Sequence, residues 1–340
     1  RSTPIKSSAA SDVYKRQEEV YRATMSYLDW RVYGFFFSFI AVMFRAFYVS
    51  TTNTKILTAN SVVMVLTNVV LNYILIFGKF GFPALGIAGA AIASSISEAV
   101  SVLFFVIYTW KKIDYKKYGL FRFTRVDFRM LGQILSVSIW VMIQHGIAFG
   151  GWFIFFIAME HLGERPLAIT NVVRSISSFL FMFVNAFAST NSSLVSNLIG
   201  AGESDRVLPL CRRMIGLCYA FVLPIGILIA MFPSTVLRIY TDNPDLIASS
   251  IPSLWVMLSS YLFAVPGFIY FFSVSGTGNT RRALEIDMAS IFVYVLYILY
   301  VAVWLRADVA VCWTTEYVYN IMILSSFFYL WKGNWRNKKI

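Results

Sequence analysis

Several apolar segments of this chain contain ionisable or amide side chains, the residues most able to do chemistry in such surroundings. Glu98 lies in the middle of the apolar run 87–110 and is the deepest carboxylate in the sequence. An Asp, Lys or Arg at the centre of a membrane-spanning helix costs about 2.5–3.5 kcal/mol on insertion scales, so such residues are functional candidates. We therefore expect Glu98 either to take up and release a proton or to form a fixed ion pair inside a helix bundle.

Two asparagines, Asn68 and Asn72, are four residues apart within the apolar run 56–77. At that spacing their amides share one face of a helix. Amide oxygens are ligands that suit hard cations, so the pair is a candidate Na+ site. Hydrogen bonding to a neighbouring helix is the alternative.

Four polar residues of the second half are candidates for contact with a substrate or a coupling ion. Gln144 and His145 are adjacent in the run 131–159. His145 either titrates near neutral pH or stays neutral and hydrogen-bonds to a neighbouring helix. Asn171 and Arg174 lie in the first turns of the run 167–199. Arg174 either contacts the substrate, locks helices together or extends toward the membrane interface.

The other acidic residues of the apolar runs are expected to have ordinary roles. Glu316 lies eight residues into the run 309–331, which favours a place near the membrane interface. Glu285 and Asp287 follow two arginines, and we expect interfacial charge pairing there. The sequence has only two histidines and shows no His/Asp constellation, metal-ligand spacing or nucleotide-binding loop. We therefore predict no catalytic residue and no enzyme activity.

The composition places these residues in a membrane protein. Of the 340 residues, 58% are hydrophobic and 14% are charged, whereas a soluble domain carries about 25% charged residues. Runs of about 20 apolar residues can cross a bilayer as helices. Nine such runs are present, at 32–50, 56–77, 87–110, 131–159, 167–199, 214–232, 251–274, 283–305 and 309–331. The sequence therefore predicts an all-α polytopic membrane protein.

Lysine and arginine are distributed unevenly between the connections of these runs. One alternating set of connections holds seventeen of them and the other set holds four. Connections rich in lysine and arginine stay in the cytoplasm, so the C-terminus is predicted to be cytoplasmic. The same distribution explains the net charge of +12 without nucleic acid as a partner.

An internal repeat divides the chain. Residues 52–55 resemble residues 278–281, and residues 108–111 resemble residues 329–332. Parallel repeats of this kind predict two helical lobes with a substrate cavity between them. The second lobe has six predicted spans and the first has three, so we expect a parent with six plus six spans, of which about nine are retained here.

The predicted domain organisation follows from the repeat. Residues 7–17 resemble the translation of a sequencing-library adaptor, and we expect the segment 1–17 to be non-native. A remainder of the N-terminal lobe is predicted at 18–112, a cytoplasmic linker at 113–130, a C-terminal lobe at 131–332 and a cytoplasmic tail at 333–340. The first lobe would then lack three spans, and the chain alone is not expected to transport.

Four motifs, in the correct order, resemble those of the multidrug and toxic compound extrusion (MATE) family. Residues 196–206, Ser-Asn-Leu-Ile-Gly-Ala-Gly-Glu-Ser-Asp-Arg, end the fifth of the nine runs and are similar to the family signature at the end of a span. Residues 68–78 and 86–93 resemble its fifth helix and the start of its sixth, and residues 278–281 resemble a later loop. The resemblance covers residue 18 to the C-terminus. It implies a V-shaped pair of six-helix lobes that exports organic cations or drugs, driven by inward Na+ or H+.

The sequence departs from the family at the sites that couple ions. One branch carries an aspartate at the place of Asn72, so this chain has lost a charge there. Another branch uses a glutamate in the seventh helix and an aspartate in the tenth. The corresponding runs, 131–159 and 251–274, contain no acidic residue here. We therefore do not carry over that branch's site in the C-terminal lobe.

The function implied is a secondary active antiporter that exports organic cations, drugs or toxic metabolites across the bacterial inner membrane in exchange for Na+ or H+. We expect no cofactor besides the coupling ion, small molecules and the lipid bilayer as partners, and a monomer. A lipid-linked oligosaccharide flippase of the same superfamily is the alternative, and a membrane-embedded enzyme is a third. Flippases need a cationic cavity, and only Arg45 and Arg174 lie within the predicted spans, which favours organic cations.

Overall fold

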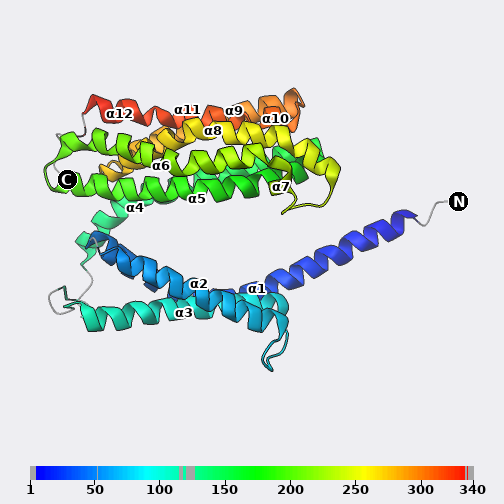
Figure 1. Ribbon diagram of the computed structural model, residues 1–340, viewed down its shortest axis with the longest axis horizontal. Coiled ribbons are helices and arrows are strands. Elements are labelled where there is room, and N and C mark those ends of the chain that lie inside the picture. The colour runs from blue at the N-terminus through cyan, green and yellow to red at the C-terminus, as the bar shows by residue number, and fades with distance from the viewer. Residues whose placement is uncertain (1–4, 52, 115–117, 120–126, 334, 336–340) are drawn as a thin grey trace. The chain divides into compact units, whose positions relative to one another are not determined.

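The computed structural model describes residues 5–51, 53–114, 118–119, 127–333 and 335 (Figure 1). Every regular element among these residues is a helix. The chain divides into two compact units, Arg1–Arg125 and Val126–Ile340, each of which is described by itself. The division falls inside the connection predicted at 113–130, of which residues 115–117 and 120–126 lie outside the described residues, as does most of the predicted tail at 333–340.

Within the described residues, eight helical segments are long and apolar enough to cross a membrane. Unit 1 contributes Tyr21–Ser50 of α1 (Ile5–Ser50), α2 (Lys55–Phe77) and α3 (Gly86–Lys112). Unit 2 contributes α4 (Phe128–Leu162), α5 (Glu164–Gly200), α6 (Val207–Met231), α8 (Pro244–Gly276) and α9 (Thr280–Ile298). These segments correspond to the first eight predicted runs and confirm the prediction of an all-helical polytopic membrane protein.

In unit 1, α3 packs against both α1 and α2 (Figure 1). The buried ring of Tyr48 stacks on Phe105 with centroids 5.7 Å apart, and its hydroxyl lies 2.6 Å from Thr109 Oγ1. A second close contact is at Gly89, where an added Cβ would lie 2.6 Å from the Leu75 carbonyl oxygen. Aromatic stacking and glycine contact together fix α3 between its two neighbours.

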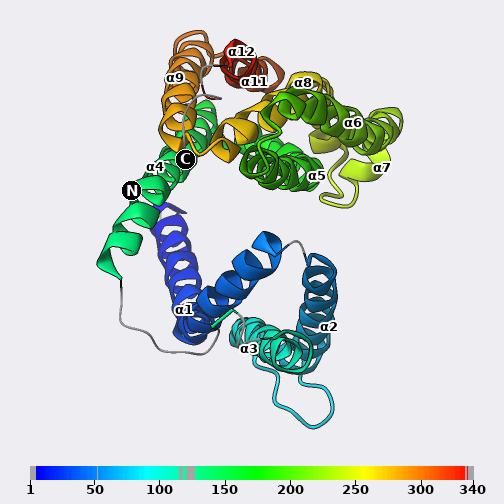
Figure 2. The same ribbon diagram turned by 90° about the vertical axis from the view of Figure 1, so that its left-hand side faces the viewer.

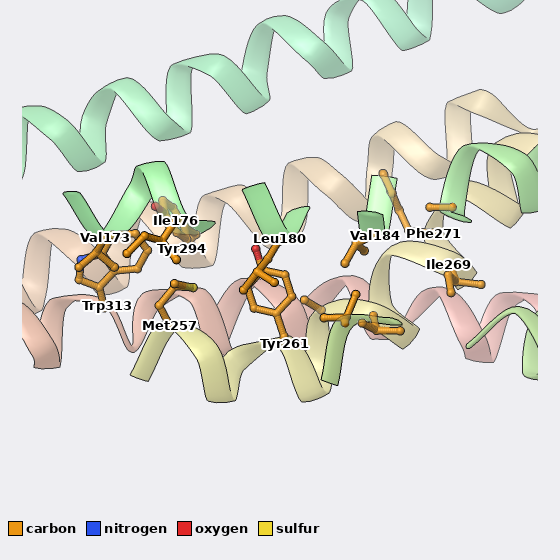
Figure 3. Packing of buried hydrophobic residues seen from close by; sticks show 14 of the residues in the cluster. Val173, Ile176, Leu180, Val184, Met257, Tyr261, Ile269, Phe271, Tyr294 and Trp313 are labelled. Atoms are coloured by element: carbon orange, nitrogen blue, oxygen red, sulfur yellow. The ribbon is translucent and has the colours of Figure 1, made fainter. Parts of the chain in front are cut away.

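In unit 2, α8 packs against α5, α6, α9 and α11 (Thr315–Leu324), as Figure 2 shows. One face of α5 carries Val173, Ile176, Leu180 and Val184, which are buried at a spacing of three to four residues. That spacing places them on a single helical stripe. Figure 3 shows this stripe packed against side chains that include Tyr261 of α8.

The signature-like segment forms the end of α5. Gly202 has a φ of +78°, which L side chains rarely adopt, and the Glu203 N–H donates to the Leu198 carbonyl at 2.8 Å. A left-handed residue followed by such a hydrogen bond is a common way to end a helix. The exposed pair Arg206–Glu203, at 2.8 Å, follows directly. The glycine at position 202 thus ends α5.

The ninth predicted span, 309–331, is not one helix. It consists of α10 (Val309–Cys312), α11 and α12 (Ser326–Lys332), none of which is long enough to cross a membrane alone. The Thr314 and Thr315 hydroxyls donate to the carbonyls of Val311 and Cys312 at 2.6 and 2.5 Å. Hydroxyl groups that bond to nearby backbone in this way compete with the helical ladder, which hydropathy does not detect.

Candidate functional site

Unit 2 contains a cavity of about 240 Å³, enclosed by α4, α5, α8, α9 and α11. Its walls are largely aromatic and include Phe149, Trp152, Phe181 and Phe268. The polar groups of the wall come mostly from serine and tyrosine side chains. Arg174 and Glu316 are the charged residues that line it. An aromatic cavity with few polar groups is the usual form of a small-molecule site.

Glu316 lies in the first turn of α11 and lines this cavity. No hydrogen bond or ion pair from another described residue reaches its carboxylate. The first turn of a helix favours negative charge, because free backbone N–H groups point there. Glu316 therefore lies inside the helix bundle of unit 2, and its place near the membrane interface stays a prediction.

Polar atoms without partners surround Glu316. The hydroxyl of Tyr294 and the amide oxygen of Asn320 are buried and have no hydrogen-bond partner. Tyr294, Asn320 and Tyr261 all line the same cavity. Tyr261 donates to the backbone carbonyl of Ser177 at 2.7 Å, which holds α8 against α5. The cavity wall around Glu316 thus contains oxygen atoms that can hydrogen-bond to a bound ion or small molecule.

Asp287 is a second interior carboxylate, 2% exposed. Tyr319, which lines the cavity, donates to its Oδ1 at 2.9 Å. Asp287 therefore joins α9 to α11. Among the predicted candidates, Gln144 of α4 is buried but does not line the cavity.

The expected pairing of Asp287 with the preceding arginines is wrong. Glu285 forms the ion pairs with both arginines, with Arg281 Nε at 3.3 Å and Arg282 Nη1 at 2.5 Å. Residues three or four positions apart share a helix face, and Glu285 stands at that spacing from both arginines. Asp287 lies two residues further on and faces the interior instead. Helical spacing in the sequence could therefore have predicted that Glu285, and not Asp287, pairs with the arginines.

Arg174 stands over two rings of α4, 4.5 Å from the Phe156 centroid and 5.4 Å from that of Trp152. Such cation–π contacts hold α5 against α4, so the structure supports the reading of Arg174 as a helix lock that also lines the cavity. His145 and Asn171 are exposed and do not line it. Neighbouring residues on a helix point about 100° apart, which explains why Gln144 is buried and His145 is not.

In unit 1, Glu98 forms an ion pair with Arg31 of α1 at 2.6 Å. The two side chains are 14% and 21% exposed, respectively. The structure supports a fixed ion pair, one of the two predicted readings. The sequence interpretation missed Arg31 because it began the first span at residue 32, whereas the apolar segment begins at Tyr21. The statement that only Arg45 and Arg174 lie within spans is therefore wrong.

Asn68 and Asn72 connect α2 to α3. Asn72 Nδ2 donates to Asn68 Oδ1 at 2.9 Å, and Asn68 Nδ2 donates to the hydroxyls of Ser94 and Ser97 at 3.4 Å each. These contacts are the predicted hydrogen bonding between helices. The Asn72 amide oxygen is buried without a partner. A Na+ ion at this pair stays a prediction. No group of three or more His, Cys, Asp or Glu residues that could hold a metal ion occurs among the described residues.

The chain resembles known proteins in sequence and in fold. The model of the MatE family matches residues 9–74 and 141–301, so the match begins within the segment 1–17. A probable multidrug resistance protein NorM of Thermotoga maritima is 29% identical over 239 residues, which are 69% of this chain and 50% of that protein. A probable multidrug resistance protein YoeA of Bacillus subtilis is 26% identical over 248 residues, which are 72% of this chain and 53% of that protein.

A mutant of the Vibrio cholerae MATE transporter VcmN has a similar structure, with a TM-score of 0.78 at 17% identity. The similarity covers 92% of this chain and 70% of that one. At this level of identity the likeness concerns the fold alone. The chain spans about half the length of the curated relatives it matches.

Proposed function

Because this chain belongs to the MatE family of membrane transporters, we propose that the protein is a secondary active antiporter. It exports organic cations, drugs or toxic metabolites in exchange for Na+ or H+. The family consists of transporters and not of enzymes, in agreement with the expectation from the sequence.

The observation that carries the proposal is the unpaired carboxylate of Glu316 in an aromatic cavity. A carboxylate removed from water needs a proton or a cation as its counter-charge. Aromatic ring faces attract organic cations, which adds affinity for this class of substrate. A single carboxylate holds one such partner at a time, so a substrate and a coupling ion compete for it. Competition of this kind is what an exchange mechanism requires.

A lipid-linked oligosaccharide flippase is the second candidate, because Arg174 also lines the cavity. Arg31 does not strengthen that candidate, since its guanidinium is paired with Glu98. The Arg174 guanidinium lies over the aromatic rings of Trp152 and Phe156 and does not extend freely into the cavity. The cavity therefore has little positive charge with which to bind the pyrophosphate group of a lipid-linked oligosaccharide. An organic cation fits the aromatic wall better.

Other expectations from the sequence accompany this proposal. The protein would lie in the bacterial inner membrane with its C-terminus in the cytoplasm, and it would work as a monomer. The free amide oxygen of Asn72 would add a ligand for Na+ in unit 1. The alternating distribution of lysine and arginine supports the orientation.

Transport by proteoliposomes tests the proposal. The protein that carries this sequence is reconstituted, a Na+ gradient and a pH gradient are imposed separately, and a fluorescent organic cation is followed. We expect dye movement against the flow of one of the two ions, abolished by an ionophore that collapses that gradient. Movement of a fluorescent lipid-linked oligosaccharide, with no dye movement under either gradient, would favour the flippase instead.

A further inference from the structure

A second hollow in unit 2 lies between α9 and the pair α11–α12. It has a volume of about 540 Å³ and is lined at one end by Arg282 and Lys332. The apolar side chains of the wall are Ile286, Ala289, Met322 and Phe328, and the polar residues Glu285, Ser290 and Ser325 line the groove as well. The Phe328 side chain is 61% exposed. This groove is separate from the cavity that contains Glu316.

The polar end of the groove has positive charge in excess. Arg282 uses Nη1 to pair with Glu285, whose other oxygen is held by Arg281. No ion pair with a described residue reaches Lys332. Asn279 Nδ2 donates to the Tyr329 hydroxyl at 2.7 Å, which leaves the hydroxyl hydrogen of Tyr329 free to be donated. The groove is thus lined by two cationic side chains, Arg282 and Lys332, and by the Tyr329 hydroxyl. Glu285 is the single carboxylate among the described lining residues.

The whole groove, with its polar end included, has about the length of one membrane leaflet. Along α9 the lining residues run from Asn279 to Ser290, which corresponds to about 16 Å of helix. The hydrocarbon core of a bilayer is about 30 Å thick, so this length is about half of it. An acyl chain that begins near Arg282 would therefore run beside Ile286 and Met322 to the middle of the membrane.

We propose that this groove binds one anionic phospholipid. The phosphate lies between Arg282 and Lys332 and accepts a hydrogen bond from Tyr329, and one acyl chain follows the apolar wall. Basic pockets between spanning helices are suited to anionic head groups. A soluble anion would leave the apolar wall without a partner, and a neutral lipid would leave Lys332 without a counter-charge. The bound lipid joins α9 to α12, the last piece of the interrupted span.

Native mass spectrometry of the purified protein tests this site, using phosphatidylglycerol and phosphatidylcholine with identical chains. We expect retention of phosphatidylglycerol over phosphatidylcholine. Arg282→Gln and Lys332→Gln should each weaken it about fivefold, as expected for one basic residue near an anionic lipid. Arg282→Lys, which keeps the charge, should retain the lipid.

Arg281→Gln is the matched control. It removes the same charge and one of the two partners of Glu285, but Arg281 does not line the groove. We expect less than a twofold effect from it. Equal retention of both lipids would overturn the proposal, and so would an equal effect of Arg281→Gln and Arg282→Gln. Displacement of the lipid by millimolar inorganic phosphate would also overturn it, because the apolar wall would then contribute nothing.

Discussion

At the scale of single residues, the two carboxylates Glu98 and Glu316 have opposite surroundings. Glu98 is held by Arg31 at 2.6 Å, whereas Glu316 faces a cavity and has no partner among the described residues. A paired carboxylate already has its counter-charge, and an unpaired one has to obtain it from solution. We therefore assign Glu98 to the stability of unit 1 and Glu316 to the exchange of cations.

Replacing Glu316 should affect transport more than folding. Glu316→Gln removes the charge but keeps the shape, and we expect binding of an organic cation to fall about 10- to 100-fold. That range corresponds to the loss of a charged hydrogen-bonding partner worth about 1.5–3 kcal/mol. Dye efflux at matched protein levels measures it. Glu285→Gln, at an exposed carboxylate, should leave efflux nearly unchanged, and undiminished efflux by Glu316→Gln would refute the assignment.

Replacing one partner of the Arg31–Glu98 pair should destabilise unit 1. Breaking a fully buried pair by removing one member costs about 3–5 kcal/mol. The Arg31–Glu98 pair should lose less than this, because both side chains are partly exposed. Glu98→Gln and Arg31→Gln should each lower the unfolding temperature of the purified protein, and the double variant should recover part of that loss. A double variant as unstable as the sum of both would show that the pair is not coupled.

The sequence correctly predicted those arrangements that depend only on spacing along a single helix. The shared face of Asn68 and Asn72 follows from a four-residue spacing and is present in the structure. The partner of Glu98 and the cavity at Glu316 depend on which helices pack together, and spacing along one helix does not contain that information. Depth within an apolar run therefore ranked Glu98 above Glu316, whereas our proposal, which rests on the pairing of Glu98 and the cavity at Glu316, ranks Glu316 first.

At the scale of helices, α5 and α8 are in close contact at a glycine. A Cβ on Gly276 would lie 2.6 Å from the Ser192 carbonyl oxygen, and Ser196 Oγ donates to the Gly276 carbonyl at 2.8 Å. Small residues at helix contacts allow backbones to approach in membranes. The contact thus fixes the distance between the two helices that flank the cavity.

An alanine at position 276 should disturb this contact. We expect Gly276→Ala to destabilise the protein by about 1–3 kcal/mol, the usual cost of an added methyl group in a tightly packed interior. Gly216→Ala is the control, because a Cβ at Gly216 of α6 would meet nothing within 4 Å. It should be neutral or slightly stabilising, since alanine favours helix. Thermal unfolding of both variants in detergent measures the difference, and similar values would contradict the close approach.

Hydropathy predicted the long helices well, since eight of nine runs correspond to helical segments long enough to span a membrane. It failed for the run 309–331, where apolar composition continues through two interruptions. The hydroxyls at Thr314 and Thr315 bond to the preceding turn, and Ser325 separates α11 from α12. Hydropathy averages over about 20 residues, whereas each interruption is made by one or two side chains.

At the scale of the whole molecule, the orientation in the membrane is a prediction from charge. Ser204 and Asn243 lie beyond opposite ends of α6. The three native cysteines are buried, so a cysteine introduced at either position should dominate labelling. In intact cells, a membrane-impermeant thiol reagent should react with Asn243→Cys and spare Ser204→Cys. The reverse pattern would invert the orientation.

The interruption of the last span has a kinetic consequence. A continuous helix exchanges its backbone hydrogens with solvent mainly from its ends, but a helix made of three pieces also has internal ends. Glu316 lies in the first turn of α11, beside one of them. Hydrogen exchange should therefore be faster around Thr314 and Ser325 than in the middle of α8. The carboxylate that we assign to cation exchange then stands where the backbone opens locally, without unfolding of the surrounding bundle.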